Sequence, residues 1–308
     1  MIYLGLDGGG STVRMGAYAE DMSAVGEVTH RNSVNPSTIG REPATARIHA
    51  AIRELLDNTG LSVGDIDAIG VGISGADTGH SREWLLQTLA VVLPGVAVTA
   101  SGDYEIALVA AHGERYGTLI LSGTGSVAYG VNRAGRGHRV GGWGYYIGDE
   151  GSGYWLGMMA LRHLAHVADG RAESSLLAEQ VRMATGIDRA MDELIGWVYH
   201  SGGPRNQDMA RLASVVLDCA EKGDAVARKL IAQAADDLYA HYTALVSTLD
   251  LEDAPIGFAG GLLSSVNPLS GRLMQLLGMD VLPQPMHSPT GGAALLAKIA
   301  LEKNADGD

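Results

Sequence analysis

The sequence predicts an α/β protein made of two related halves that enclose a cleft. Strand-like apolar runs alternate with amphipathic helical stretches along the chain, as in layered α/β folds. The segment LGLDGGGST (4–12) has a counterpart in LILSGTGSV (119–127), and AIGVGISGA (68–76) has one in PIGFAGGLL (255–263). Such self-similarity in a fixed order indicates two related domains. The chain has 308 residues, of which 46% are apolar, and this is enough for two buried cores.

The first half shows clear helix and strand signals. Ile48, Ile52 and Leu55 fall on one face of a helix, and Pro94-Gly95 ends the next one. The predicted elements are strands at 2–7 and 13–18 joined by a glycine turn, a helix at 44–58, a strand at 68–76, a helix at 82–95, a strand at 96–103 and a helix at 104–113.

The second half starts the same order again and then adds helices. A third correspondence links VAVTASGD (96–103) with MDVLPQP (279–285), which predicts a strand at the second position as well. The predicted elements are a strand, glycine turn and strand over 117–131, helices at 153–168, 173–184, 206–222 and 224–249, a strand at 255–265, and a strand, proline loop and helix over 279–303.

Composition excludes several classes of protein. The net charge is −13, from 22 basic and 35 acidic side chains, and no basic cluster suggests nucleic-acid binding. Cys219 is the single cysteine, so an intrachain disulfide and a Cys-ligated zinc or iron–sulfur site are excluded, and a buried helix position is expected for it. The N-terminus enters a strand at once and no apolar run approaches ~20 residues, so we expect a cytoplasmic protein that binds no membrane.

The first glycine turn has more glycines than a hairpin needs. Gly8, Gly9 and Gly10 are followed by Ser11, whereas a tight turn requires only one or two residues with positive φ. Three glycines let bare N–H groups converge on an anion, and the Ser11 hydroxyl would add a bond to a phosphate oxygen. The alternative is a flexible hairpin tip.

Two further glycine segments suit a nucleotide. The turn Gly123-Thr124-Gly125 lies between Ser122 and Ser126, and FAGGLLSS (258–265) offers a platform for a base or ribose. Two such turns facing each other could hold the phosphate chain of a nucleoside triphosphate. The pattern is neither G-x-x-x-x-G-K-[ST] nor a dinucleotide fingerprint, because the first glycines lead into a second strand.

Two aspartates follow strands. Asp7 beside the glycine turn would repel phosphate unless Mg²⁺ lay between them, directly or through water; the alternative is an Asx-turn. Asp103 follows the strand at 96–103 and could act as the base that deprotonates an acceptor hydroxyl; the alternative is a helix N-cap.

The segment GGWGYYIGDEGSGYWLG (141–157) combines glycines, aromatic residues and acids. Carboxylates and carbonyls there suit the hydroxyls of a polyol, with Asp149 the favoured ligand; Asp149 and Glu150 could instead start the next helix. Asn35, in a loop before a helix, could bond a sugar hydroxyl or simply precede Pro36. His163 and His166 lack a third metal ligand and are expected to be ordinary helix residues.

Four motifs occur in order over nearly the whole chain: Asp7-Gly8-Gly9-Gly10-Ser11, Ser122-Gly123-Thr124-Gly125-Ser126, GGWG (141–144) with GDEGS (148–152), and Gly260-Gly261. This set resembles the N-acetylglucosamine kinase branch of the BadF/BadG/BcrA/BcrD ATPase family, within the sugar kinase, heat-shock ATPase and actin superfamily. The resemblance implies two ribonuclease-H-like (actin-like ATPase) domains around a central cleft. They would be residues 1–115, completed by the C-terminal helix 291–308, and residues 116–290 with helical insertions.

The resemblance also implies the ligands and the site. ATP with Mg²⁺ would lie in the cleft, and the protein would be a homodimer. Ser11 and Thr124 would contact phosphates, and Gly260, Gly261 and Ser264 would line the adenosine side. Asp103 would be the catalytic base that activates the C6 hydroxyl of an amino sugar. The residues at the amino-sugar positions are Asn35, Asp103, Ser126, Gly142, Trp143, Gly144 and Asp149.

The sequence leaves the sugar open among N-acetylglucosamine, glucosamine, N-acetylmuramic acid and a plain hexose, because residues 145–147 lie between the sugar-contacting motifs. A second hypothesis is an ATP-binding sensor without kinase activity, which has no need of a base such as Asp103. A third is an ATPase that activates another enzyme through an iron–sulfur cluster, which the missing cysteines disfavour.

Overall fold

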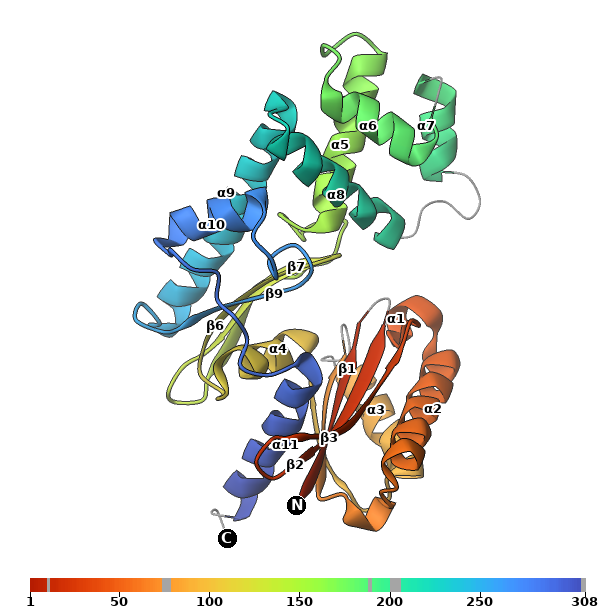
Figure 1. Cartoon of the computed structure of the whole chain (residues 1–308), viewed down its shortest axis with the longest axis vertical. Helices are drawn as coiled ribbons and strands as arrows, with labels where there is room; N and C mark the ends of the chain where they lie inside the picture. Colours follow the sequence, from red (N-terminus) through yellow and green to blue (C-terminus); the bar gives the residue numbers. More distant parts are fainter. Residues whose placement is uncertain (10–11, 74–78, 188–189, 200–205, 306–308) are drawn as a thin grey trace.

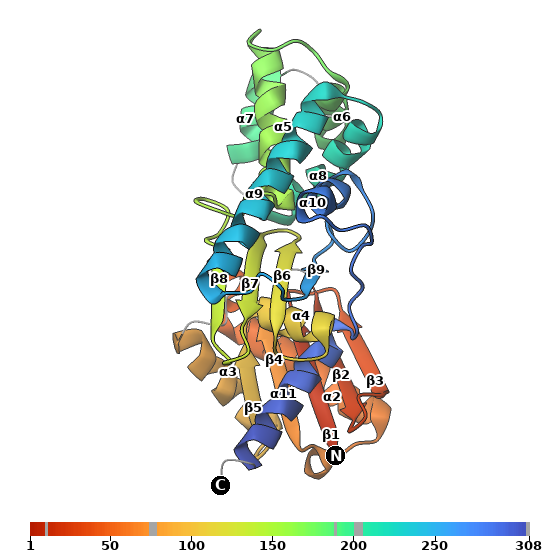
Figure 2. The ribbon, with the colours of Figure 1, turned by 90° about the vertical axis from the view of Figure 1, so that its left-hand side faces the viewer.

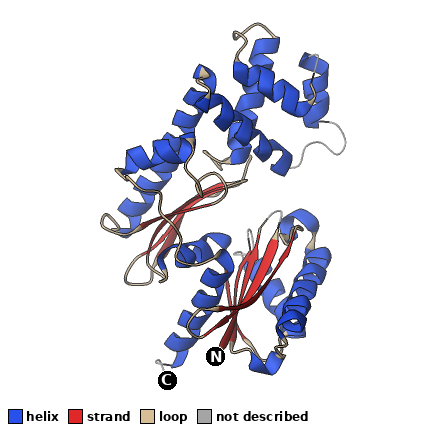
Figure 3. Ribbon diagram, in the orientation of Figure 1, coloured by secondary structure: helices blue, strands red, loops and turns tan. Residues whose placement is uncertain are grey.

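The structure, a computed structural model, describes residues 1–9, 12–73, 79–187, 190–199 and 206–305. Two β-sheets form in this part of the chain, and each is the centre of one lobe (Figure 1). Both lobes contain strands and helices (Figure 3). The predicted α/β class with two related sheets is confirmed.

The sheet of the first lobe has the strand order β3-β2-β1-β4-β5. Its first three strands are antiparallel neighbours, whereas β4 and β5 are parallel to β1. All six residues of β4 are buried, as expected for a central strand covered on both faces. Its strands are β1 (Ile2–Gly8), β2 (Val13–Ala19), β3 (Ala24–His30), β4 (Ala68–Ile73) and β5 (Ala97–Ser101).

Helices cover both faces of this sheet (Figure 2). On one side α2 packs on β2 and β3, and on the other α4 and α11 pack on β1 and β4. The helical segments of this lobe are α1 (Pro36–Ile39), α2 (Arg41–Thr59), η1 (Val63–Asp65), α3 (Gly79–Val92), α4 (Asp103–His112) and α11 (Pro289–Ala305).

The last helix lies unusually close to the first sheet. A Cβ atom at Gly70 would overlap the carbonyl oxygen of Ala293, and one at Gly5 would overlap the carbonyl oxygen of Thr290. Glycine at these two strand positions therefore lets α11 rest directly on β1 and β4. The last helix and the first strand, which are far apart in the sequence, consequently lie side by side (Figure 1).

The sheet of the second lobe has the strand order β8-β7-β6-β9, and β9 is parallel to β6. The strands β6 and β7 form the hairpin of the second glycine turn. Its strands are β6 (Gly117–Ser122), β7 (Ser126–Val131), β8 (Gly137–Gly141) and β9 (Ile256–Ala259). Its helices are α5 (Gly153–Ala168), α6 (Leu176–Thr185), α7 (Ala190–Tyr199), α8 (Asn206–Glu221), α9 (Ala225–Leu249) and α10 (Pro268–Leu277).

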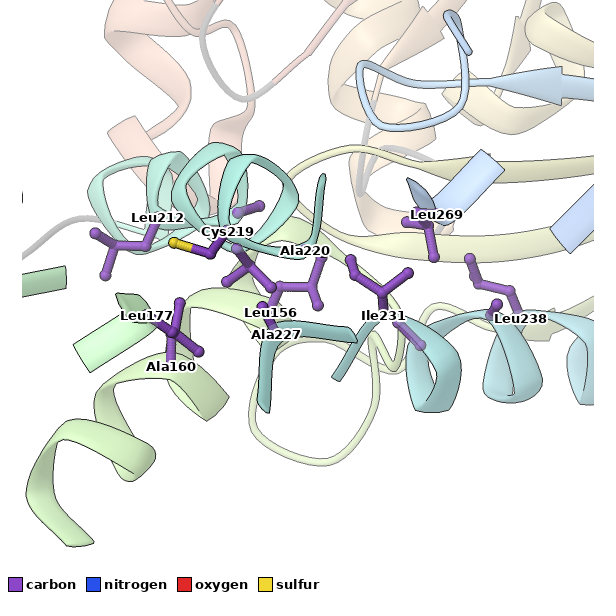
Figure 4. Packing of buried hydrophobic residues seen from close by; sticks show 14 of the residues in the cluster. Leu156, Ala160, Leu177, Leu212, Cys219, Ala220, Ala227, Ile231, Leu238 and Leu269 are labelled. Carbon is purple, nitrogen blue, oxygen red and sulfur yellow. The ribbon is translucent and has the colours of Figure 1, made fainter. Parts of the chain in front are cut away.

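The largest core of the second lobe lies among its helices (Figure 4). Cys219 of α8 is fully buried there beside Leu212 and Ala220, and burial raises the pKa of its thiol. This confirms the expectation of a buried helix cysteine. A separate apolar cluster joins the lobes, because it combines side chains from α4, β6, β7 and α11.

The expectation of a strand at 279–285 is wrong. These residues form no strand, and β9 is the edge of the second sheet on that side. Pro283 and Pro285 lack the N–H groups that a ladder requires. The correspondence between 96–103 and 279–285 therefore fails.

The sequence reading also missed several elements. The strands β3 and β8 carry no strong periodic signal, and β8 has three glycine or charged residues among its five. The helices α7 and α10 are amphipathic and were missed nevertheless. The helix expected at 82–95 runs from Gly79 to Val92. Every helix in the described ranges is too short or too polar to cross a lipid bilayer.

Candidate functional site

The carboxyl ends of β1, β4 and β5 meet at one edge of the first sheet, because these three strands are parallel. Asp7 lies opposite Gly72, which in turn lies opposite Ser101. The helix α4 begins at Asp103, directly after β5. The two aspartates expected to carry chemistry therefore share this edge.

Asp103 is the first residue of α4, and Gly102 is the N-cap. The Oδ1 atom of Asp103 accepts the N–H of Tyr104 at 3.0 Å. The alternative reading of Asp103 as the N-cap is therefore wrong. As a first-turn residue, Asp103 lies at the positive end of the helix dipole.

Asp7 forms an ion pair across the first hairpin. The Nη1 atom of Arg14 donates to Oδ2 of Asp7 at 2.9 Å, and the Asp7 side chain is only 14% exposed. Burial raises the pKa of Asp7, and the charge of Arg14 opposes this rise. One carboxylate of this kind is sufficient for Mg²⁺ when phosphates and waters supply the other ligands.

The tip of the first hairpin is closed by a hydrogen bond from the N–H of Gly9 to the carbonyl of Thr12, at 2.9 Å. Gly8 ends β1, where a β-carbon would press against neighbouring apolar side chains. Gly10 and Ser11, both expected to contact phosphate, lie outside the described residues.

Asn35 is the N-cap of the short helix α1. Its Oδ1 atom accepts the N–H of Ser37 at 2.9 Å, and its own N–H donates to Oγ of Ser33 at 3.1 Å. The side-chain oxygen therefore has a structural partner, and the Nδ2 amide is the part of Asn35 suited to a sugar oxygen.

The second glycine turn is anchored to the segment before α5. The hydroxyl of Ser122 donates to the carbonyl of Gly151 at 2.8 Å, and the hydroxyl of Ser126 donates to the carbonyl of Glu150 at 2.7 Å. Ser126 is expected to contact the sugar. Because its hydroxyl already donates to the protein, it can only accept a hydrogen bond from a ligand.

The same turn supplies acceptors for the start of α5. The carbonyl of Gly123 accepts the N–H of Gly153 at 2.8 Å, and the carbonyl of Thr124 accepts the N–H of Tyr154 at 3.2 Å. Because these carbonyls point toward α5, the turn is held in one orientation. Thr124 lies exposed at its tip.

The third glycine turn packs on the second. Gly260 has φ +85°, and a Cβ atom there would overlap the carbonyl oxygen of Ser122. That carbonyl also accepts the N–H of Leu262 at 3.1 Å. The hydroxyl of Ser264 donates to the carbonyl of Gly260 at 2.6 Å, so Ser264 shapes this turn, while Gly261 has nothing within 4 Å of its Cβ position.

Asp149 connects the segment at 141–157 with the second glycine turn. A Cβ atom at Gly125 would lie 2.9 Å from Oδ2 of Asp149, and the carboxylate accepts the N–H groups of Ser126 and Gly144. Asp149 has φ 59°, a conformation that aspartate tolerates better than most residues. Burial raises the pKa of its carboxyl.

The residues before Asp149 form an exposed aromatic loop. Gly142 and Gly144 have φ values of 66° and 87°, which flank Trp143 with left-handed turns. The Trp143 side chain is 69% exposed. The ring of Tyr145 lies 4.9 Å from that of Tyr154 on α5, so part of the loop rests on that helix.

The glycines of the second and third turns fall into two groups, according to whether the fold itself requires glycine. This difference bears on whether the turns can bind a nucleotide. Gly260 and Gly125 have internal reasons to be glycine, namely the contacts with Ser122 and Asp149. Gly123 and Gly261 have ordinary φ values, and their Cβ positions meet nothing closer than 3.8 Å. Packing therefore does not require glycine there, and the absence of side chains leaves room for the close approach of a ligand.

Three aromatic or basic residues near this site were missed by the sequence reading. The ring of Tyr104 lies 4.6 Å from that of Tyr129 on β7, which connects the start of α4 with the second sheet. The Cζ atom of Arg139 on β8 lies 5.9 Å from the ring centroid of Tyr104 and 5.9 Å from that of Trp143. The only sequence signal was that Arg139 immediately precedes the Val-Gly-Gly-Trp run.

His163 and His166 both lie on the helix α5. Nε2 of His163 lies 2.8 Å from Oγ of Ser175, and burial lowers the pKa of His163. In the ranges that the structure describes, no cluster of three or more His, Cys, Asp or Glu side chains could hold a metal ion.

The structure thus gathers the expected residues into two groups, one on each lobe. The first group is Asp7, Gly8, Gly9, Asn35 and Asp103. The second is Gly123, Thr124, Gly125, Ser126, Gly142, Trp143, Gly144, Asp149, Gly260, Gly261 and Ser264. The tilted ring pair of Tyr104 and Tyr129 is a contact between the two lobes.

Known proteins resemble the chain over nearly its full length. The N-acetylmuramic acid/N-acetylglucosamine kinase of Clostridium acetobutylicum is 31% identical, covering 98% of this chain and 99% of the relative. The N-acetyl-D-glucosamine kinase of Dictyostelium discoideum is 29% identical, covering 96% and 97%. A Chromobacterium violaceum structure provisionally assigned as an N-acetylglucosamine kinase superposes with a TM-score of 0.78 at 28% identity, covering 96% of this chain and 98% of the other.

The family model confirms the resemblance that the motifs suggested. It matches residues 4–297, which include all four motifs and both sheets. The chain belongs to the BadF/BadG/BcrA/BcrD ATPase family.

Proposed function

We propose that this protein is an ATP-dependent kinase that phosphorylates the C6 hydroxyl of an amino sugar, with N-acetylglucosamine as the first candidate. Both curated relatives described above are named as kinases of N-acetylglucosamine. The site offers what such a reaction needs, namely glycine turns for phosphates, a carboxylate for sugar hydroxyls and an aspartate at a helix start for the proton.

The phosphate end of the reaction uses the three glycine turns. N–H groups of the first and second turns bind the phosphate chain, and Gly260 and Gly261 face the nucleoside. Asp7 would hold Mg²⁺, directly or through water. When bound, that ion neutralises charge on the β- and γ-phosphates.

The sugar end uses the residues around Asp149 and Asp103. Asp149, with its carboxylate fixed by two N–H groups, accepts hydrogen bonds from sugar hydroxyls. Asp103 accepts the proton of the C6 hydroxyl as that oxygen attacks the γ-phosphorus. The bond from the γ-phosphorus to the bridging oxygen breaks, and ADP leaves with the electron pair.

One observation carries the proposal: the carboxylate of Asp149 lies against Gly125 of the second turn. A group suited to sugar hydroxyls and a turn suited to phosphate are thereby neighbours, as transfer between the two substrates requires.

We propose further that residues 1–115 with the C-terminal helix form one domain and residues 116–290 the other. The protein acts in the cytoplasm, where ATP is available, and is a homodimer. Light scattering after size-exclusion chromatography measures the oligomeric state, and a monomeric mass would rule out the dimer.

The first experiment measures ADP release from ATP and Mg²⁺ with N-acetylglucosamine, glucosamine, N-acetylmuramic acid, N-acetylmannosamine and glucose, against a blank without sugar. A large rate with an amino sugar supports the kinase. Equal slow rates with every sugar and with none would favour an ATP-binding sensor instead.

The base is tested with Asp103→Asn, which keeps the Oδ1 acceptor for Tyr104 but cannot take a proton. We expect kcat to fall by about 10²–10⁴-fold with little change in the sugar Kd. Asp21→Asn, in the exposed β2–β3 turn, is the control and should keep full activity. Normal turnover by Asp103→Asn would disprove the base assignment.

A further inference from the structure

The loop at residues 142–149, which carries the proposed sugar ligand Asp149, begins and ends beside the side chain of His241 on α9. The helix α9 packs on β7 and β8 (Figure 2). At the start of the loop, a Cβ atom on Gly141 would lie 2.9 Å from Cε1 of His241. At its end, Nε2 of His241 lies 3.6 Å from Oε2 of Glu150, within the range of an ionic contact. The His241 ring therefore lies against both ends of the loop.

The backbone at the two ends of the loop fits closely against α9. Gly141 has φ 74° and Gly151 has φ 75°. A Cβ atom on Gly151 would lie 2.7 Å from the carbonyl oxygen of Ala234 and 2.6 Å from Cγ of Leu238. The three heavy atoms nearest to a Cβ on Gly141 all belong to the ring of His241. The end of the loop thus rests on the body of α9, and its start rests on the imidazole.

Three carboxylates interact electrostatically with His241. Asp149 and Glu150 are neighbours in the chain, and Asp237 lies one turn before His241 on α9. Burial raises the pKa of the Asp237 carboxyl, the charge of Glu150 adds to this rise, and His241 opposes it. Glu150 and His241 act on the pKa of Asp149 in the same two directions. Repulsion among these acids pushes the loop away from α9, and a hydrogen-bond donor or cation at position 241 counters that repulsion.

The ring of His241 is not placed to the advantage of stability. Its Nδ1 atom is buried and has no hydrogen-bond partner among the residues that the structure describes. A buried polar atom without a partner costs stability, and an apolar side chain of similar size would pack against Gly141 without that cost. The feature that an apolar residue would lack is the contact of Nε2 with Glu150.

We propose that His241 is a positioning residue for the sugar site. Its ring contacts Gly141 and Glu150, so that the loop between them presents Asp149 to the sugar. Asp149 then keeps its place against Gly125 of the second glycine turn. His241 acts through the loop and contacts neither ATP nor sugar. The inference rests on the proposed kinase function and extends it by giving a role to Glu150 and to α9.

The first test compares His241→Met with wild-type protein, using the sugar that wild-type protein phosphorylates fastest. We expect KM for the sugar to rise by about tenfold, a loss typical of contacting residues, while KM for ATP changes by less than about twofold. The midpoint of urea unfolding should stay the same or rise, because the buried Nδ1 atom is removed. A histidine that served only the fold would instead lower the midpoint and leave the ratio of the two KM values unchanged.

Three further variants separate the contact from other effects. His163→Met is the matched control, because His163 is a half-buried helix histidine of the same lobe whose Nε2 lies 2.8 Å from Oγ of Ser175. It lies about three turns along α5 from the second glycine turn and should leave both KM values unchanged. His241→Gln keeps an N–H donor near the Nε2 position and should recover part of the loss. Combining His241→Met with Glu150→Gln should raise the sugar KM no further than the worse single variant, because the two side chains act as a pair.

A measurement without substrates tests the loop itself. Hydrogen exchange of the N–H groups at 142–149 should be about tenfold faster in His241→Met, whereas His163→Met should leave it unchanged. Unchanged exchange, or an unchanged sugar KM in an active kinase, would overturn the inference while the proposed function stands. Failure of wild-type protein to phosphorylate any sugar would remove the proposed function, and the positioning role with it.

Discussion

At the scale of single residues, neighbouring glycines in the third turn have different reasons to be glycine. Gly260 has positive φ and no room for a Cβ atom beside Ser122. Gly261 has neither constraint. The first glycine therefore serves the fold, and the second leaves space for a ligand.

This difference predicts that two alanine substitutions affect different properties, namely stability and the KM for ATP. Gly260→Ala should lower the free energy of unfolding by about 1–3 kcal/mol, because it combines strain with overpacking. Gly261→Ala should change stability by less than about 0.5 kcal/mol. It should instead raise KM for ATP by about tenfold, or about 1.4 kcal/mol of binding energy. Urea denaturation and ATP kinetics measure both; equal losses of stability would contradict the distinction.

Asp149 is the second residue with a measurable signature. Burial raises the pKa of its carboxyl above the ordinary aspartate value, even though two N–H groups favour the ionised form. An acid whose pKa is higher in the folded protein destabilises the fold while ionised. This penalty is absent below the unfolded pKa and complete above the folded pKa.

We therefore expect wild-type protein to lose stability relative to Asp149→Asn as pH rises from about 4, the ordinary aspartate pKa, toward neutrality. Urea denaturation at a series of pH values measures the difference between the two proteins, so that other titrating groups cancel. A wild-type advantage that grows with pH would show that the N–H groups of Ser126 and Gly144 outweigh burial.

At the scale of elements, the start of α5 ties the second turn to the helical part of the lobe. Ser152 caps α5 by accepting the N–H of Trp155 at 3.1 Å, and it is fully buried. The N–H groups of the two residues after Ser152 donate to the carbonyls of Gly123 and Thr124. A shift at this helix end should therefore move the second glycine turn.

Ser152→Ala should cost about 1 kcal/mol of stability and also raise KM for ATP. Ser175→Ala is the matched control, because Ser175 caps α6 by accepting the N–H of Ala178 at 3.2 Å. It should cost a similar amount of stability, while the ATP kinetics stay unchanged because α6 lies away from the turns (Figure 1). Equal kinetic effects in the two variants would contradict the coupling.

At the scale of the whole molecule, the two lobes are joined through one apolar cluster on α4, β6, β7 and α11. The ion pair of Glu105 with Arg115, at 2.7 Å, and the bond from Arg115 to the carbonyl of Gly135, at 2.9 Å, reinforce this junction. The proposed ligands contact both lobes on the far side of the junction, so binding favours closure about it.

Closure predicts a smaller radius of gyration when ATP, Mg²⁺ and the sugar are bound together. Small-angle X-ray scattering of the Asp103→Asn variant measures this without turnover. The fluorescence of the exposed Trp143 should change on addition of sugar, and Trp143→Phe is the control for that signal. A scattering curve that ligands leave unchanged would exclude closure.

The sequence by itself determined the α/β class, the two glycine-turn hairpins, the buried helix of Cys219 and the family. These features depend on local hydrophobic periodicity and on turn residues, both of which can be recognised in a short stretch of sequence. The same local reading misassigned 279–285, because an apolar stretch resembles a strand until its prolines must take part in a ladder.

Only the tertiary structure decided which expected residues meet. The carboxylate of Asp149 lies against Gly125, Gly260 packs on Ser122, and Arg139 approaches Tyr104. These contacts join segments that are far apart in sequence and depend on strand order and helix packing. No local pattern contains that information, because it arises only when the two sheets and the last helix assemble.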